Sequence, residues 1–162
     1  MAIAMTKRPV ATKAGQARSK PRAAPSHARP LAKADYEALA EFRFALRKFL
    51  DFSQGAAHAA GLTPQQHQAL LAIKGYPGRD EVTVSELAGR LLLRHHSAVE
   101  LIDRLERLDL IRRRPDPADH RRVLVGVTAK ADQLLGSLSA THLEEIRRLG
   151  PYLAALLEQF GR

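Results

Sequence analysis

The chain has 162 residues, a formal net charge of +9 and no cysteine, with 45% hydrophobic and 27% charged residues. This length allows one domain of ordinary size with its own core, and the composition is typical of a soluble fold. We expect the chain to be cytoplasmic. The longest apolar runs, such as 69–73, are far shorter than the roughly 20 residues of a membrane span, and without cysteine neither a disulfide nor a thiol switch can form.

Residues 1–33 are predicted to be a basic, disordered tail. They contain eight of the 26 basic residues and none of the 17 acidic ones, which leaves 18 basic against 17 acidic residues in the body, 34–162. The tail lacks periodic apolar residues and an apolar stretch typical of a secretory signal. It is either a basic arm that adds sequence-independent phosphate contacts or a dispensable extension. A start codon assigned too far upstream is a further alternative, with Met5 as the other start.

The body begins with two helical patterns. Apolar residues at helical spacing predict a helix over 35–60, with Gly61 at its C-terminal cap. A second helix is predicted over 63–75, because the hydroxyl of Thr63 can cap it and a proline follows at the first helical position. We expect 76–80 to form a loop.

Two further helical patterns flank a tight break at 92–94. Thr83 and Glu86 form a Thr-x-x-Glu capping box for a helix over 84–91, and a second helix is predicted over 95–108. The second helix is amphipathic, and the residues opposite its apolar face are His96, Val99, Glu100, Asp103 and Arg107. That face is either a surface that contacts bases or the solvated side of an ordinary helix.

The next segment predicts a β-hairpin with a charged turn. Strands are expected over 110–114 and 123–127, with the turn over 115–122. A helix suited to the major groove and a basic hairpin suited to the minor groove would contact neighbouring parts of one duplex. The order of elements therefore predicts a helix-turn-helix with a wing.

The C-terminal segment predicts long helices. Thr128 can cap the first, Gly150-Pro151 is expected to break it, and a last helix is predicted over 152–160. This last helix has more apolar surface than a terminal helix of a small monomer needs to cover the core. It either forms an interface with a second copy of the chain or packs on the helix at 35–60.

These segments resemble the multiple-antibiotic-resistance regulator (MarR) family of bacterial winged-helix transcription factors. The matching sequence segments are 85–91, 101–107 and 113–128. The last of them contains the family's Asp-x-Arg wing signature ahead of a strand that ends in Thr. The resemblance is specific over roughly 62–135 and absent before Asp35.

The resemblance implies a fold and a function. The fold class is mainly α with a small β-hairpin wing: a winged helix-turn-helix at about 62–128 plus dimerisation helices at about 35–60 and 129–161. The function it implies is that of a ligand-responsive repressor, which binds a pseudo-palindromic DNA operator as a homodimer. The alternative is an architectural, weakly specific DNA-binding protein that uses its basic tail and wing.

The resemblance also implies residue roles. Arg121 is similar to the wing-tip arginine that enters the minor groove, and Asp119 to the carboxylate that holds its guanidinium. Positions 95–97, 99 and 100 match the base-facing part of the recognition helix. The full set of expected DNA-binding residues is Arg94, His95, His96, Ser97, Val99, Glu100, Arg104, Arg113, Asp119, Arg121 and Arg122.

Two positions depart from the family's pattern. Leu92-Leu93-Arg94 replaces the family's common Gly-Val-Ser, so Arg94 stands where a capping hydroxyl usually lies, which puts the turn geometry and the cap in doubt. Glu100 stands where relatives have a basic or small residue. It either accepts a hydrogen bond from cytosine N4 or pairs with Arg104 one turn on.

The family's effectors imply a cleft between the dimerisation helices and the winged domain, for a small aromatic or carboxylic compound. Arg43, Arg47, His58 and His67 lie on helices that would border it, either as ligand contacts or as ordinary surface residues. No metal, cofactor or enzyme activity is expected, because the histidines are scattered and no nucleophile elbow or phosphate-binding glycine loop is present.

Overall fold

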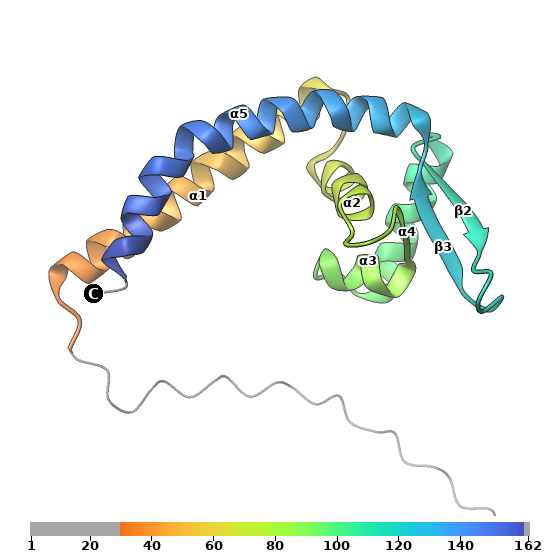
Figure 1. Cartoon of the computed structure of the whole chain (residues 1–162), viewed down its shortest axis with the longest axis horizontal. Coiled ribbons are helices and arrows are strands. Elements are labelled where there is room, and N and C mark those ends of the chain that lie inside the picture. Colours follow the sequence, from red (N-terminus) through yellow and green to blue (C-terminus); the bar gives the residue numbers. More distant parts are fainter. Residues whose placement is uncertain (1–29, 161–162) are drawn as a thin grey trace, which may run out of the picture. The chain divides into compact units, whose positions relative to one another are not determined.

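The computed structural model describes residues 30–160, so the predictions for residues 1–29 lie outside the described part of the chain. The elements confirm a mainly helical fold with a small β wing (Figure 1). They are α1 (Lys33–Ala59), α2 (Pro64–Lys74), β1 (Glu81–Thr83), α3 (Val84–Arg90), α4 (His95–Arg107), β2 (Ile111–Pro115), β3 (Val123–Val127) and α5 (Ala129–Gln159). None of these described helices is long and apolar enough to cross a membrane.

The winged domain is built from α2, α3, α4 and the sheet around one hydrophobic core. Its largest fully buried side chains come from all of these elements and are Leu70, Ile73, Val82, Leu87, Leu101, Ile102, Leu105 and Val125. Burial of each such side chain contributes about 1.5–3 kcal/mol to folding. This core fixes α3 and α4 relative to the wing.

The sheet has three antiparallel strands in the order β1-β3-β2. The hairpin of β2 and β3 was predicted, but β1 was not, because three residues are too few to show a period-2 pattern. In the register, Glu81 of β1 lies opposite Gly126 of β3, and Gly126 lies opposite Arg112 of β2. Side chains from the two outer strands therefore meet across a glycine.

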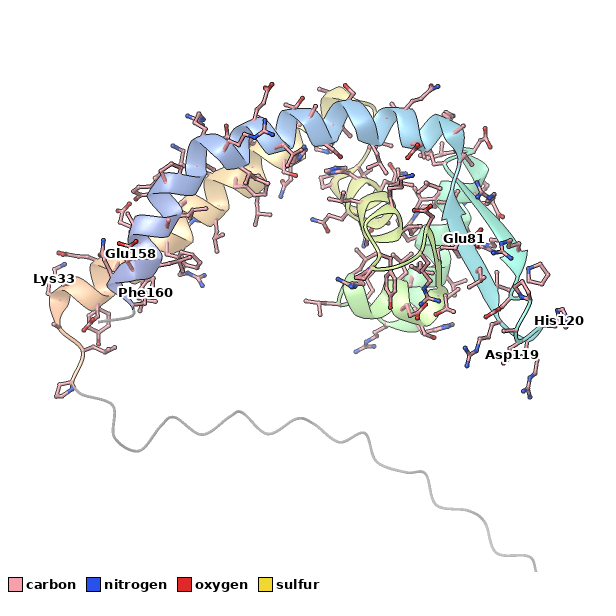
Figure 2. The ribbon with its side chains drawn as sticks, in the orientation of Figure 1. Lys33, Glu81, Asp119, His120, Glu158 and Phe160 are labelled. Carbon is pink, nitrogen blue, oxygen red and sulfur yellow. The ribbon has the colours of Figure 1, made fainter. Side chains whose placement is uncertain are left out.

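Helices α1 and α5 lie side by side (Figure 1), and α2 packs against both of them. Figure 2 shows Phe160 at the end of this helix pair where Lys33 begins α1. There the rings of Phe42 and Phe160 meet edge to face with centroids 6.1 Å apart, and the Tyr152 hydroxyl donates to Glu41 at 2.7 Å. The C-terminal helix thus packs on the first helix within one chain.

The predicted break at Gly150-Pro151 is wrong. Helix α5 runs from Ala129 to Gln159 with Pro151 inside it. A proline inside a helix removes one main-chain hydrogen bond and costs about 3 kcal/mol. Packing beyond the proline offsets that cost, because Leu156 is buried and the Phe160 ring packs on α1.

Helices α1, α3 and α4 end in the same Schellman arrangement. The residue after each C-cap has a positive φ: Gly61 at 75°, Leu92 at 55° and Asp109 at 56°. The next amide donates to the carbonyl five residues back at 2.9–3.0 Å, in the pairs Leu62→Ala57, Leu93→Ala88 and Leu110→Leu105. Glycine adopts this conformation without steric cost, whereas leucine does not.

Candidate nucleic-acid interface

The outward face of α4 is the first part of the candidate interface. The inward residues Ala98, Leu101, Ile102 and Leu105 are buried. The residues predicted to point away from the core are exposed or half-buried: His96, Val99, Glu100, Asp103 and Arg107. The same holds for His95, Ser97 and Arg104 on the flanks of that face. In the part of the chain that the structure describes, the alternative pair between Glu100 and Arg104 is not formed.

The turn before α4 resolves the doubt raised by its unusual residues. Leu92 has a left-handed backbone conformation, which favours glycine, and its side chain is 94% exposed. Arg94 is the N-cap of α4 in an extended conformation, and its side chain makes no capping hydrogen bond. The helix-turn-helix geometry is therefore kept, without a side-chain cap on the recognition helix.

The wing tip is organised by one carboxylate. Oδ1 of Asp119 accepts from the Arg121 amide at 3.1 Å and from its Nε at 3.3 Å, and Oδ2 lies 3.4 Å from Nε of Arg122. Figure 2 shows Asp119 and His120 at the tip of the hairpin. The Arg121 side chain is 93% exposed, so Asp119 orients a guanidinium that has little other contact.

A second carboxylate organises the strands of the wing. Glu81 crosses β3 at Gly126 and binds Arg114 on β2, with both carboxylate oxygens 2.9 Å from its Nε. The hydrogen bond from Arg114 lowers the pKa of Glu81. A Cβ at Gly126 would lie 3.0 Å from Cγ of Glu81, so the glycine leaves room for this crossing.

Arg113 lies on the other face of the hairpin from that pair. It forms an ion pair with Asp103 of α4, and its Nε lies 3.4 Å from Glu106. Arg113 was predicted as a DNA-binding residue. The structure places it against the recognition helix, where it holds the wing to α4.

A cleft of about 510 Å³ joins the recognition helix to the wing. Its lining combines hydroxyl groups, one carboxylate and several cationic groups, from Arg79, Thr83, Val84, Ser85, Glu86, His95, Arg121, Arg122 and Val123. Three of the predicted residues, His95, Arg121 and Arg122, are therefore brought together. Sequence reasoning missed Arg79, because it lies in a loop with no periodic pattern.

Of the four predicted effector residues, three are exposed and one is buried. Arg43, Arg47 and His58 are exposed on α1. His67 is buried, and its ring centroid lies 4.8 Å from that of His142 on α5. Burial, with a smaller contribution from His142, lowers the pKa of His67.

His142 was treated as one of the scattered histidines. It is buried, its Nδ1 lies 2.6 Å from the carbonyl oxygen of Leu138, and its Nε2 lies 2.8 Å from the hydroxyl of Ser53. Its spacing of four and seven residues from the buried Leu138 and Leu135 marks it as an inward position. Among residues 30–160, no three metal-binding side chains lie together.

The pair α3–α4, its tight turn and the β2–β3 hairpin define a winged helix-turn-helix, a class of DNA-binding domain. Residues 60–122 match the model of the MarR family. This match covers the winged helix-turn-helix of the chain, and the similar proteins described next are transcriptional regulators.

The chain is similar to transcriptional regulator HosA of Escherichia coli O111:H-, with 34% identity over 76 residues that cover 47% of this chain and 54% of HosA. The chain spans about half the length of the curated relatives it matches. Among solved structures, AbsC, a MarR family transcriptional regulator from Streptomyces coelicolor, shares the fold with a TM-score of 0.63 and 21% identity, over 75% of this chain and 81% of AbsC. A mutant of S. aureus MepR bound to an oligodeoxyribonucleotide also shares it, with a TM-score of 0.58 and 21% identity, over 77% of this chain and 94% of MepR.

Proposed function

We propose that this chain is a sequence-specific transcriptional regulator that binds double-stranded DNA as a homodimer. The observation that carries the proposal is the cleft in which His95, at the start of α4, and Arg121, at the wing tip, line one cationic surface. A helix in the major groove and a wing in the adjacent minor groove must be bridged by the phosphate backbone between them. The cleft has the position and the charge that such a strand requires.

Specificity is assigned to the outward face of α4. His96 and Glu100 are exposed and Val99 is half-buried on that face. Because Glu100 does not pair with Arg104, its carboxylate is available to accept a hydrogen bond from cytosine N4. The side chain of Val99 can contact the methyl group of thymine.

Dimerisation is assigned to α1 and α5. Both helices keep large apolar side chains exposed after they have packed on each other: Tyr36, Leu39, Phe44, Leu46 and Leu50 on α1, and Leu143, Ile146, Tyr152 and Leu157 on α5. Exposed apolar surface of this extent is uncommon on a monomer and typical of an interface. Two copies related by a twofold axis would contact half-sites about one helical turn, ~34 Å, apart.

Response to an effector belongs to the same proposal. A small aromatic carboxylate that bound along α1 would meet Arg43, Arg47 and His58, which are exposed. His67 would have to separate from His142 before it could contact such a compound. Titration of a protein–DNA complex with benzoate tests this part, and Arg43→Gln and Arg47→Gln should weaken release if the assignment is correct.

Selection of bound duplexes from a random pool tests the proposed function. Recovery of an inverted repeat with half-sites about one turn apart is the expected result. The alternative, an architectural protein that binds through its basic tail and wing, predicts recovery without a consensus sequence.

The oligomeric state tests the assignment of α1 and α5. Ile146→Glu should convert a dimer to a monomer in sedimentation equilibrium, because it places a charge in the proposed interface. Leu108→Glu is the matched control, since Leu108 is 46% exposed in the winged domain and Ile146 is 47% exposed. A wild-type chain that sediments as a monomer at micromolar concentration would contradict the assignment.

A further inference from the structure

We propose that Tyr76, Arg79, Glu86 and Arg90, here called the Tyr76 cluster, form a second phosphate-binding site beside the wing. Tyr76 is its positioning residue, and Arg79 and Arg90 are its phosphate ligands. The proposal rests on the DNA binding proposed above. It assigns two contacts, Arg79 and Arg90, that lie outside both the recognition helix and the wing.

The two guanidinium groups are held over one aromatic ring. Cζ of Arg79 lies 4.8 Å from the ring centroid of Tyr76, and Cζ of Arg90 lies 5.0 Å from it. The ring itself is half-buried and packs against the winged-domain core. A fixed aromatic face attracts a guanidinium and limits its motion, so both groups are ordered before any ligand arrives.

Glu86 completes the arrangement. Its carboxylate accepts from the Thr83 amide at 2.8 Å and from the Thr83 hydroxyl at 2.9 Å, as the capping box of α3 requires. It also accepts from the Tyr76 hydroxyl at 3.4 Å and pairs with Arg79. The hydrogen bond from the Thr83 amide is the largest of the effects that lower the pKa of Glu86.

The cluster keeps a positive charge after this pairing. It contains two guanidinium groups and one carboxylate, and only Arg79 pairs with that carboxylate, while Arg90 contacts the Tyr76 ring. A guanidinium has five N–H donors in a planar fork. The Arg79 side chain is 43% exposed. Donors that Glu86 does not use can therefore reach an anionic oxygen from solvent.

The location of the cluster indicates which anion it binds. Arg79 lines the cleft that also contains His95, Arg121 and Arg122, while Arg90 lines a separate hollow between α2 and α3 and is linked to Arg79 through the Tyr76 ring. A DNA strand that leaves the wing and passes α4 presents its phosphates to this cleft. Phosphate contacts of this kind set the register of a protein on the duplex without selecting a sequence.

The salt dependence of DNA binding tests the two ligands. Each phosphate contact contributes about −0.9 to the slope of log K against log salt concentration, so Arg79→Gln and Arg90→Gln should each flatten the slope by about one unit. Affinity should fall equally for a selected site and for a scrambled duplex. Arg148→Gln is the matched control, because Arg148 is likewise exposed and paired with a carboxylate, Glu145, but lies far along α5.

The positioning role of Tyr76 has its own test. Tyr76→Leu should flatten the slope like the loss of an arginine, whereas Tyr76→Phe, which keeps the aromatic face, should restore the wild-type slope. Glu86→Gln keeps the capping box, since glutamine also serves in it, and should steepen the slope and tighten binding to both duplexes. If the pair of Arg79 and Glu86 were purely structural, Glu86→Gln would not increase DNA affinity.

The outcomes separate this proposal from the function on which it rests. If the wild-type chain binds no DNA, the proposed function fails first. If the chain binds DNA in an Arg121-dependent way while Arg79→Gln, Arg90→Gln and Tyr76→Leu match Arg148→Gln, the Tyr76 cluster is not a phosphate site. Thermal denaturation of each variant shows that the compared proteins are folded.

Discussion

At the scale of single residues, the arginines of the wing differ in how their carboxylate partners hold them. Arg114 is bound to Glu81, and Arg113 is held by Asp103 on the recognition helix. Arg121 differs, because Asp119 contacts it through Nε while nearly all of its side chain stays exposed. One carboxylate thus orients the guanidinium without covering it.

Arg121→Ala tests this distinction. We expect DNA affinity to fall by about 1–3 kcal/mol with a change in unfolding free energy below about 0.5 kcal/mol, because an exposed side chain supports no core. Arg113→Ala is the comparison, and it should lower stability more than Arg121→Ala does. Calorimetric binding and urea unfolding measure the two quantities, and unchanged affinity for Arg121→Ala would contradict the assignment.

Leu92 is a strained residue. Its φ of 55° costs a residue with a Cβ about 1–2 kcal/mol, and its exposed side chain recovers none of that through packing. Leu92→Gly should therefore raise the free energy of unfolding by about 1 kcal/mol in urea titration. Leu108→Gly, at a helix end with negative φ, should lower it. A loss of stability in Leu92→Gly would mean that the leucine has a packing role that the structure does not contain.

The buried imidazole of His67 should make the free energy of unfolding depend on pH. Because burial lowers its pKa in the folded chain, the unfolded chain binds the proton more readily. Stability should therefore fall as the pH drops through about 6.5, the ordinary value for histidine, and continue to fall until the lower folded pKa is passed.

Urea unfolding between pH 7.5 and 5.5, at one protein concentration, measures this effect. His67→Gln should reduce the slope of unfolding free energy against pH, while His58→Gln, on the exposed surface of α1, should leave it unchanged. Equal slopes in the wild type and His67→Gln would show that this imidazole is not the responsible group.

At the scale of elements, tertiary packing keeps α5 helical through a proline that would be expected to end it. Its main chain continues through Pro151, although a proline usually ends a helix. Pro151→Ala should raise the free energy of unfolding by about 1–3 kcal/mol, because it restores a hydrogen bond to a helix that is already continuous. No gain in thermal or urea stability would indicate that the helix is interrupted there in solution.

Elements with a local signature could be predicted from the sequence. The capping boxes at Thr63 and Thr83, the cap at Thr128 and the glycine after α1 each mark a helix end through residues a few positions apart. Strand β1 could not be predicted, because it is defined by its pairing with β3, which lies far along the chain. Its first residue, Glu81, pairs with Gly126, and its last, Thr83, pairs with Leu124.

The candidate site likewise contains residues that could be predicted from the sequence and residues that could not. The wing carboxylate Asp119 and its arginines are neighbours in sequence, so their motif could be recognised. The Tyr76 cluster joins a loop to both ends of α3, and the contact between His67 and His142 joins α2 to α5. Only tertiary packing brings these residues together.

At the scale of the whole molecule, the proposed function requires two surfaces. The winged domain would present a helix, a wing and a cationic cleft to DNA, and α1 with α5 would present an exposed apolar surface to a second copy. A homodimer would place two recognition helices on one duplex, so sequence preference would depend on both copies. Neither part alone accounts for selective binding to an inverted repeat.

The most direct measurement is equilibrium binding of the full chain to its selected duplex and to a scrambled duplex of equal length and composition, at about 0.15 M salt. The account predicts that the selected duplex binds ~10³-fold or more tightly than the scrambled one, because α4 contacts base edges as well as phosphates. Equal affinity for the two duplexes would contradict it.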